Sequence, residues 1–305
     1  MGQRHVVVAG NGMVGQRFVD RLVAGDADRA YRITVVGEEC RPAYDRVALS
    51  TWFEGRTEAD LRLVAPDFVA SGRVDYRLGV RVASIRPDER TVTLADGALV
   101  EYDELVLATG SSPFVPPIRG NDLAGTFVYR TLDDLAAIKD WTDRAPRSAG
   151  IVVGGGLLGL EAANALRVLG LDVHVVEMAP YPMPQQLGEG GGRMLARWVE
   201  SLGVHLHCGV APEEFVPDAD GCVRGLRMAD GTEYPADIVV FSAGVRPRDE
   251  IARACGIDVG GRGGVIVDDT LGTSAPNVWA IGEVVQHRGR VYGLVAPGYE
   301  MAATL

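Results

Sequence analysis

Residues 151–161 read IVVGGGLLGLE, and this stretch decides how the chain folds. Three apolar residues predict a buried strand, and Gly154, Gly156 and Gly159 then keep the G-x-G-x-x-G spacing into an apolar helix. Glycine is needed because a pyrophosphate reaches a helix N-terminus only where the turn is tight and no side chain blocks the backbone N–H groups. The stretch therefore predicts a dinucleotide site. We assign to its turn Gly154, Gly156, Leu157, Leu158 and Gly159.

The chain opens with a second copy of this pattern. Residues 5–22 read HVVVAGNGMVGQRFVDRL, in which an apolar strand, three glycines at the same spacing and a helix follow one another. One such match is a weak signal, whereas two on one chain indicate two dinucleotide sites. The residues assigned to this first turn are Gly10, Asn11, Gly12, Met13, Val14 and Gly15.

An acidic residue closes the strand that follows each glycine turn. The predicted strand Arg32–Val36 leads into Glu38 and Glu39. The predicted strand Asp172–Val176 leads into Glu177. A carboxylate at this strand end binds the ribose hydroxyls of an adenosine and repels a 2′-phosphate. We therefore expect ribose contacts from Glu38 and Glu177, and NADH rather than NADPH; the alternative for Glu38 is a solvated loop charge.

Each glycine unit also predicts a small antiparallel meander and a strand that ends on small residues. The first meander is expected over residues 74–94 with a turn at Asp96-Gly97, and the second lies around Asp230-Gly231. Small residues at a strand end allow a ligand to approach closely. These residues are Ala108, Thr109 and Gly110 in the first unit and Gly244 in the second.

The order of these elements predicts an α/β fold with two Rossmann-like dinucleotide-binding domains. Proline residues after residue 110 mark a crossing into a new domain, and the chain returns to the first domain after Pro247. We expect one discontinuous domain over 1–115 and 246–305, with the other inserted at 116–245. A chain of 305 residues is long enough for both cores.

The composition excludes several classes of partner. No apolar run approaches the roughly 20 residues needed to cross a bilayer, so we expect a cytoplasmic protein with no membrane partner. A net charge of −11 argues against nucleic acid as a partner. The four cysteines lie far apart without C-x-x-C spacing, which predicts no redox disulfide and no iron–sulfur ligand set.

Two histidines form the one metal-like pattern in the sequence. His205 and His207 alternate along a predicted strand, so their imidazoles share one face. No third ligand is in view in the sequence. A half-exposed strand is therefore the favoured interpretation, and we predict no metal.

Taken together, these landmarks resemble the two-dinucleotide-binding flavoproteins, a family like the pyridine nucleotide-disulphide oxidoreductases. The resemblance runs through essentially the whole chain and is most specific for the N-terminal flavin module of the large subunit of NADH-dependent assimilatory nitrite reductases. It implies that the first domain binds FAD and the inserted domain binds NADH. The similar strings are VVVAGNGMVGQRF, AYDRVALS, FVYRTLDDL, GGGLLGLEAANAL, FSAGVRPRD and YGLVAPGYEMA.

The resemblance also implies roles for single residues. Glu161 is similar to a glutamate beside the nicotinamide and is our candidate catalytic residue. The alternative is a carboxylate near a helix N-terminus that only favours the helix dipole. Further residues assigned to FAD on this basis are Glu39, Arg46, Val82, Ala108, Thr109, Gly110, Gly282 and Glu283.

Departures from the family pattern bear on which of the family's reactions this chain would carry out. Leu49-Ser50 is followed by Thr51, where ferredoxin reductase relatives have a lysine. NADH oxidases and peroxidases carry a reactive cysteine in this region, and none lies between Tyr44 and Phe53. Relatives continue into a C-terminal interface domain, which we expect to be missing here, and nitrite reductases add iron–sulfur and sirohaem domains.

The resemblance thus implies an NADH-dependent FAD oxidoreductase. Its acceptor would be an iron–sulfur/sirohaem domain or a separate electron-acceptor protein, and this chain alone would show diaphorase activity without reducing nitrite. Two alternatives stay open. One is an NADH oxidase or peroxidase-like flavoenzyme, and the other is an FAD-binding signalling protein with slow NADH turnover. A homodimer also stays open.

Overall fold

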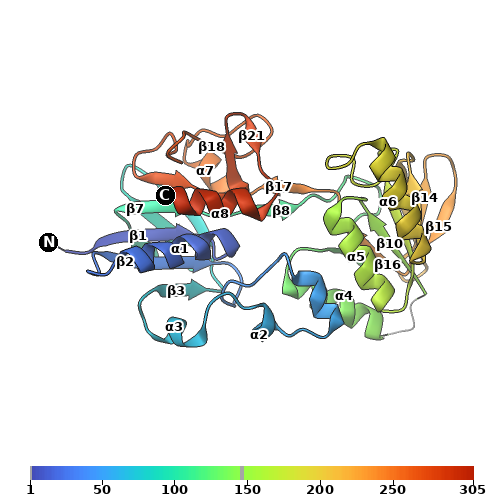
Figure 1. Ribbon diagram of the computed structural model, residues 1–305, viewed down its shortest axis with the longest axis horizontal. Coiled ribbons are helices and arrows are strands. Elements are labelled where there is room, and N and C mark those ends of the chain that lie inside the picture. The colour runs from blue at the N-terminus through green and yellow to red at the C-terminus, as the bar shows by residue number, and fades with distance from the viewer. Residues whose placement is uncertain (1, 145–147) are drawn as a thin grey trace. The chain divides into compact units, whose positions relative to one another are not determined.

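The structure, a computed structural model, describes residues 2–144 and 148–305 (Figure 1). It divides into two compact units. The first contains Met1–Asp45, Ala59–Ser112 and Arg246–Leu305, and the second contains Arg46–Glu58 and Pro113–Val245. The division thus places Arg46–Glu58 in the second unit, apart from the stretches that precede and follow it in the chain.

The first unit is built on a five-stranded parallel sheet (Figure 1). Its central strand is buried at every residue except the first, as a parallel sheet covered on both faces requires. The strand order is β19 (Val278–Ala280), β7 (Glu104–Leu107), β1 (Arg4–Ala9), β2 (Tyr31–Gly37) and β3 (Asp75–Leu78). The helices α1 (Met13–Gly25) and α8 (Val295–Thr304) pack against each other.

Smaller elements complete this unit. An antiparallel meander packs into the same hydrophobic core as the parallel sheet and consists of β4 (Val82–Arg86), β5 (Thr91–Leu94) and β6 (Leu99–Glu101). A second small sheet contains β18 (Val265–Val267), β20 (Val285–His287) and β21 (Arg290–Val291). The short helices are α2 (Glu58–Leu61), α3 (Pro66–Ala70), α7 (Glu250–Ala254) and the 3₁₀ turn η2 (Gly282–Val284).

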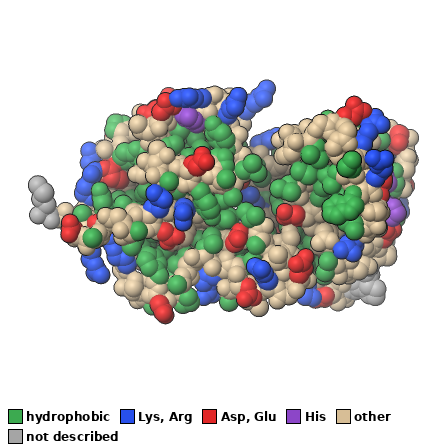
Figure 2. Space-filling model, viewed as in Figure 1, with side chains coloured by type: hydrophobic (Ala, Val, Ile, Leu, Met, Phe, Trp, Pro, Cys, Tyr) green, Lys and Arg blue, Asp and Glu red, His purple; other side chains and the backbone are tan. Residues whose placement is uncertain are grey.

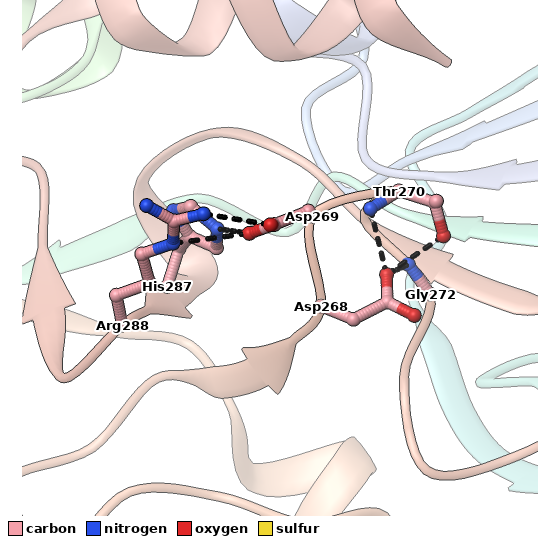
Figure 3. A network of polar contacts seen from close by, with 6 residues as sticks. All are labelled: Asp268, Asp269, Thr270, Gly272, His287 and Arg288. Carbon is pink, nitrogen blue, oxygen red and sulfur yellow. Dashed lines mark hydrogen bonds and ion pairs between the residues drawn. The ribbon is translucent and has the colours of Figure 1, made fainter.

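One loop of this unit is held by two neighbouring aspartates (Figure 3). Asp268 accepts hydrogen bonds from the backbone N–H groups of Thr270 and Gly272. Asp269 pairs with His287 at 2.8 Å and with Arg288 at 2.6 Å. The loop that follows β18 is thereby tied to the end of β20.

The second unit repeats this plan. Its parallel sheet has the order β12 (Val204–Cys208), β11 (Asp172–Glu177), β10 (Ala149–Val153), β16 (Ile238–Phe241) and β9 (Thr126–Val128). Helices pack along it, namely α4 (Leu132–Arg144), α5 (Leu157–Val168) and α6 (Glu189–Ser201) (Figure 1). An antiparallel sheet shares a core with it and contains β13 (Pro212–Pro217), β14 (Val223–Met228) and β15 (Glu233–Pro235).

Three remaining elements lie near the points where the chain passes between the units. The strands β8 (Ser111–Pro113) and β17 (Val245–Pro247) pair with each other. The 3₁₀ helix η1 (Leu49–Glu54) packs against α5 within the second unit.

On the face drawn in Figure 2, acidic and basic side chains are interspersed among apolar ones.

The α/β prediction with two Rossmann-like units and small antiparallel sheets is confirmed. One detail was wrong, because residues 75–78 do not belong to the first meander. They form β3, which pairs in parallel with β2 at the edge of the large sheet. The chain changes direction at Gly79, where φ is +75°, before β4 begins the meander. A short strand pattern shows that a strand exists but does not show which sheet it joins.

Candidate functional site

The first glycine turn lies between β1 and α1, and its three glycines meet different surroundings. Gly10 has a φ of +124°, and a Cβ atom there would overlap the carbonyl of Ala108. A Cβ atom at Gly15 would overlap the carbonyl of Gly10. Gly12 differs, because no protein atom lies within 4 Å of the position its Cβ would take. Packing of the protein therefore explains the outer glycines, whereas Gly12 leaves open space of the kind a ligand needs.

Polar groups at this turn also suit a phosphate group. Gly12 caps α1 without a side-chain hydrogen bond, and the first turn of the helix, which begins at Met13, has no acidic residue. The first turn of the helix itself therefore places no carboxylate against the positive end of the helix dipole, which favours an anion. Asn11 donates from Nδ2 to the carbonyl of Arg41 at 3.1 Å, while its buried Oδ1 has no hydrogen-bond partner. These features fit the pyrophosphate of a dinucleotide.

The predicted ribose-binding residues lie at the end of β2. Glu38 pairs with the guanidinium of Arg248 at 2.6 Å, and its side chain is half exposed. Glu39 accepts a hydrogen bond from the hydroxyl of Tyr44 at 2.8 Å. Arg248 therefore orients the carboxylate that we expect to meet the ribose.

The segment leading to Val82 runs beside the end of β2. Gly79 donates its N–H to the carbonyl of Glu39, and Val80 donates to the carbonyl of Gly37, each at 3.0 Å. Val82 itself is buried at the start of β4. The structure thus brings the backbone just before Val82 to the predicted ribose residues.

The small residues after β7 are joined to the segment that follows β17. Thr109 donates from Oγ1 to the carbonyl of Arg248 at 2.7 Å, and Arg248 donates its N–H to the carbonyl of Gly110 at 2.9 Å. Ala108 contacts the glycine turn through its backbone, as described above. Glu283 accepts a hydrogen bond from the hydroxyl of Ser111 at 2.7 Å. The strand end, Arg248 and Glu283 are therefore linked into one side of the first site.

Val14 is enclosed by two further glycines. A Cβ atom at Gly282, where φ is +83°, would lie 3.3 Å from Val14, and one at Gly298 would lie 2.6 Å from it. Gly282 also donates its N–H to the sulfur of Met301 at 3.3 Å. These close contacts pack α1, η2 and α8 together behind the glycine turn.

The second glycine turn, between β10 and α5, repeats the first. A Cβ atom at Gly154 would overlap the carbonyl of Ser242, and one at Gly159 would overlap the carbonyl of Gly154. Gly156 again has no protein atom within 4 Å of its Cβ position, and it caps α5 without a side-chain hydrogen bond. The same division between packed and open glycines is therefore present twice in the chain.

Glu177 lies directly beside this second turn. Its Oε2 accepts the N–H of Gly155 at 2.7 Å, and its Oε1 accepts the N–H of Ala179 at 2.8 Å. A carboxylate offers about four lone-pair sites, so both oxygens can still accept from a ribose. The structure thus orients Glu177 at the position where a nucleotide ribose is expected.

The remaining nucleotide residues of this unit lie around the same turn. Leu157 begins α5 and leaves about half of its side chain exposed (52%), and Leu158 follows it. Gly244 has a φ of +104° and accepts the N–H of Phe114 at its carbonyl. Their contacts with a nucleotide stay predictions.

Glu161 belongs to a hydrogen-bonded chain within the second unit. The Tyr129 hydroxyl donates to Ser50 Oγ at 3.1 Å, and Ser50 Oγ donates to Glu161 Oε2 at 3.1 Å. Burial raises the pKa of the Glu161 carboxyl, which the bond from Ser50 partly offsets, and burial raises the pKa of Tyr129 to about 12. The first turn of α5 has no acidic residue, so Glu161 lies beyond the turn where a carboxylate interacts best with the dipole.

Arg46 lies in this second unit as well. Its Nη1 donates to the carbonyl of Arg130 at 2.9 Å. The structure therefore groups this predicted FAD residue with Glu161 rather than with the first glycine turn. Its contact with FAD stays a prediction.

Several residues that organise these sites carry no motif of their own in the sequence. They share one signal, because each lies inside one of the similar strings quoted above. Ser50 lies in AYDRVALS, Tyr129 in FVYRTLDDL, and Arg248 in FSAGVRPRD. Gly298 lies in YGLVAPGYEMA.

Within residues 2–144 and 148–305, no helix has the length and apolar character needed to cross a membrane.

Known proteins resemble this chain over nearly its whole length. Residues 4–302 match the family model "Pyridine nucleotide-disulphide oxidoreductase". The chain is 45% identical over 302 residues to the nitrite reductase (NADH) large subunit of Escherichia coli (strain K12), which covers 99% of this chain and 35% of that protein. It is 49% identical over 298 residues to the nitrite reductase [NAD(P)H] large subunit of Klebsiella oxytoca, covering 98% of this chain and 31% of that protein.

A solved structure shows the same fold. Putidaredoxin reductase, in its covalent complex with putidaredoxin, matches 100% of this chain and 74% of its own chain with a TM-score of 0.92 and 26% identity. The chain spans about a third of the length of the two nitrite reductase subunits.

Proposed function

The chain belongs to the pyridine nucleotide-disulphide oxidoreductase family, and from this premise we propose that it is an NADH-dependent FAD oxidoreductase. It passes electrons from NADH through FAD to a downstream acceptor, as a diaphorase module of an assimilatory nitrite reductase would. The observation that carries this proposal is the pair of glycine turns in which only Gly12 and Gly156 face open space. Each turn leaves open space at the glycine where a pyrophosphate would lie, and members of this family typically bind FAD and NAD(P)H.

The first unit is proposed to hold FAD. Gly12 and the N-terminus of α1 would receive the pyrophosphate, and Asn11 Oδ1 is a buried acceptor without a partner at this turn. Glu38, oriented by Arg248, would bind the adenosine ribose. Glu283, held by Ser111, would bind the ribityl chain of the flavin. When bound, FAD would supply the redox chemistry, which is acceptance of a hydride from NADH and delivery of the electrons to the acceptor.

The second unit is proposed to hold NADH. Gly156 and the N-terminus of α5 would receive its pyrophosphate, and Glu177 would bind the adenosine ribose. A 2′-phosphate would add negative charge beside the Glu177 carboxylate, so NADPH is disfavoured. The proposed NADH domain covers residues 116–245, inserted into an FAD domain over 1–115 and 246–305; Arg46–Glu58 differs from this division because it belongs to the second unit.

Glu161 is proposed to orient the nicotinamide. Its carboxylate is half-buried and held by Ser50, which in turn receives the hydroxyl of buried Tyr129. A side chain fixed in this way holds a substrate in a reactive geometry at little further entropic cost. The protein therefore contributes positioning and exclusion of water rather than an acid or base.

The electron acceptor is proposed to be an iron–sulfur/sirohaem domain or a separate protein. The four cysteines are free, and in the described part of the chain they form no cluster of ligands that could hold iron–sulfur centres. The chain alone is therefore expected to reduce artificial acceptors only.

Anaerobic titration of the purified chain with NADH tests this proposal. The protein is first saturated with added FAD and passed through a desalting column, so that only bound flavin is observed. Stepwise addition of NADH should bleach the absorbance near about 450 nm, and NADPH should do so far less efficiently. Bound flavin that does not bleach with NADH would falsify the proposal.

The same preparation separates the two alternatives. Stoichiometric NADH consumption in air without an added acceptor would favour an oxidase. A long-lived charge-transfer band after NADH addition, with slow turnover, would favour a signalling flavoprotein. Rapid reduction of ferricyanide with slow oxygen consumption is the result expected here.

A further inference from the structure

Three of the five histidines of the chain meet at one edge of the second unit. His174 lies on β11, and His205 and His207 lie on β12, the edge strand of the parallel sheet. The register pairs His174 with His205. Because side chains alternate along a strand, His205 and His207 share a face, and Asp172 and His174 share the same face on β11.

The polar atoms of this cluster converge. His205 Nε2 lies 3.0 Å from Asp172 Oδ1, and His174 Nε2 lies 3.8 Å from Asp172 Oδ2. One ligand atom from each of these three residues lies within 4.8 Å of the other two. Zinc–nitrogen bonds of about 2.0–2.1 Å place tetrahedral ligands about 3.3 Å apart, so small rotations about χ1 and χ2 would close the set around an ion.

The cluster is accessible on one side and enclosed on the other. The side chains of Asp172 and His205 are 58% and 54% exposed, whereas that of His174 is only 11% exposed. A hollow of about 300 Å³ adjoins it, lined by Glu200, Gly203, Val204, His205, Leu206 and His207. An ion can therefore enter from solvent and bind against a fixed imidazole.

His207 contacts the second ring nitrogen of His174, the less exposed imidazole of the cluster. Its Nε2 lies 2.9 Å from His174 Nδ1, and its ring stacks on Tyr234 of β15 with the centroids 3.9 Å apart. In the tautomer in which His174 donates from Nδ1 to His207, the lone pair of His174 lies on Nε2, the atom 3.8 Å from Asp172 Oδ2. Metal-binding histidines are commonly held in this way by a partner on the second ring nitrogen.

We propose that Asp172, His174 and His205 bind a divalent transition-metal ion such as Zn²⁺, and that His207 positions His174. Two imidazoles and a carboxylate are ligands that suit zinc, copper or nickel, and they leave a further position for water. Burial lowers the pKa of His174 and of His207, while the charge of Asp172 acts in the opposite direction on His174.

The consequence of binding is a cross-link between β11 and β12. The ligands lie on two strands that pair in parallel and are connected through α6, so the folded arrangement brings them together and binds an ion more tightly than the unfolded chain does. Ligands that bind the folded state more tightly raise its stability as their concentration rises. The proposal does not depend on which nucleotide the second unit binds.

Equilibrium binding of Zn²⁺ to the intact chain tests this site. The chain is prepared without a histidine purification tag, treated with a chelator, and titrated in competition with a zinc indicator. We expect one ion per chain and a thermal midpoint that rises with Zn²⁺ concentration. His205→Ala and His174→Ala should each weaken binding by more than about 100-fold, beyond the loss typical of an outer-shell change.

The controls are matched by residue type. His287→Ala removes a histidine from the first unit and should leave zinc binding unchanged. Asp172→Asn keeps the shape of the side chain and provides a second ligand variant if an alanine variant fails to fold, as judged by circular dichroism. His207→Phe should weaken binding about 10- to 100-fold without changing the stoichiometry, and His207→Gln should restore most of it.

A spectroscopic readout identifies the ligands. Cu²⁺ bound to the wild-type chain should show hyperfine coupling to two imidazole nitrogens, and His205→Ala should reduce it. The proposal is overturned if the His205→Ala and His287→Ala variants bind Zn²⁺ equally, if the chain binds no Zn²⁺, or if bound Co²⁺ shows thiolate charge-transfer bands.

Discussion

Gly12 and Gly10 lie two residues apart, yet we expect an alanine to weaken FAD binding at Gly12 and to lower the folding stability at Gly10. Gly12 has an ordinary φ of −92° and open space before it, so Gly12→Ala should fold normally and obstruct only the pyrophosphate. We expect its dissociation constant for FAD to rise about 10-fold or more, which corresponds to about 1.4 kcal/mol. Flavin fluorescence titration measures this, and the melting temperature of the flavin-free variant should match the wild type.

Gly10→Ala is the matched control within the same turn. Its Cβ would overlap the Ala108 carbonyl at a φ of +124°, so we expect a loss of about 3 kcal/mol in the free energy of unfolding. Urea denaturation of the flavin-free chains checks this difference. Equal stability of the two variants would show that the turn is not packed as described. The pair Gly156→Ala and Gly154→Ala should behave in the same way toward NADH.

Glu161→Gln tests the hydrogen-bonded chain through Ser50. The change keeps the size of the side chain but removes the charge that accepts from Ser50 Oγ. We expect flavin reduction by NADH to slow about 10- to 100-fold, because the nicotinamide loses an orienting contact. Stopped-flow absorbance under anaerobic conditions measures the rate, while FAD affinity should not change. A wild-type rate in this variant would remove Glu161 from the reaction.

Tyr129→Phe removes the first hydrogen bond of the Tyr129–Ser50–Glu161 chain but leaves the Glu161 carboxylate in place. It deletes the hydroxyl bonded to Ser50 and keeps the ring that stacks on Phe53, with centroids 6.4 Å apart. We expect a modest loss of about 1 kcal/mol in stability and a smaller loss of rate than in Glu161→Gln. A larger loss of rate than in Glu161→Gln would mean that the hydroxyl acts independently of Glu161.

At the scale of elements, the loop between β18 and β19 depends on ionised Asp269 (Figure 3). Hydrogen bonds from Arg288 and His287, together with the charge of Arg288, lower the pKa of Asp269 from 3.8 to about 2. The folded value is depressed, so the stabilising contribution is fully present above about pH 4 and is lost as the pH falls through about 2. Asp269→Asn should therefore flatten the fall of the melting temperature over this range.

Salt provides the control for this pH dependence. Asp269 and Arg288 are exposed, so added salt should weaken the pair in the wild type. In Asp269→Asn the melting temperature should respond less to salt over pH 4 to 7. If the melting temperature of Asp269→Asn falls with decreasing pH as steeply as that of the wild type, other carboxylates cause the loss of stability.

At the scale of the whole molecule, the chain should transfer electrons without reducing nitrite. The relatives that reduce nitrite are about three times as long as this chain. We expect rapid reduction of ferricyanide by NADH, because this acceptor needs only an accessible reduced flavin. Formation of ammonium from nitrite, measured in the same assay, would contradict the proposal.

Some features of this protein were predictable because consecutive residues carry them. The two glycine turns and the acidic strand ends follow from local backbone requirements, and the buried apolar strands follow from runs such as Val6–Val8. The strand β3 was misplaced because a four-residue pattern contains no information on its neighbour. The domain and site assignments rest on the resemblance and stay predictions.

The α/β class, the two dinucleotide-type turns and the acidic residue at the strand end after each turn are short-range consequences of residue spacing, so they can be read from the sequence. Which distant side chains meet depends instead on how the strands and helices pack. Glu161 reaches Ser50 across 111 positions, and His205 gains Asp172 and His174 through the register of β11 with β12. Strand register and helix packing depend on contacts throughout a core, so no local pattern specifies them.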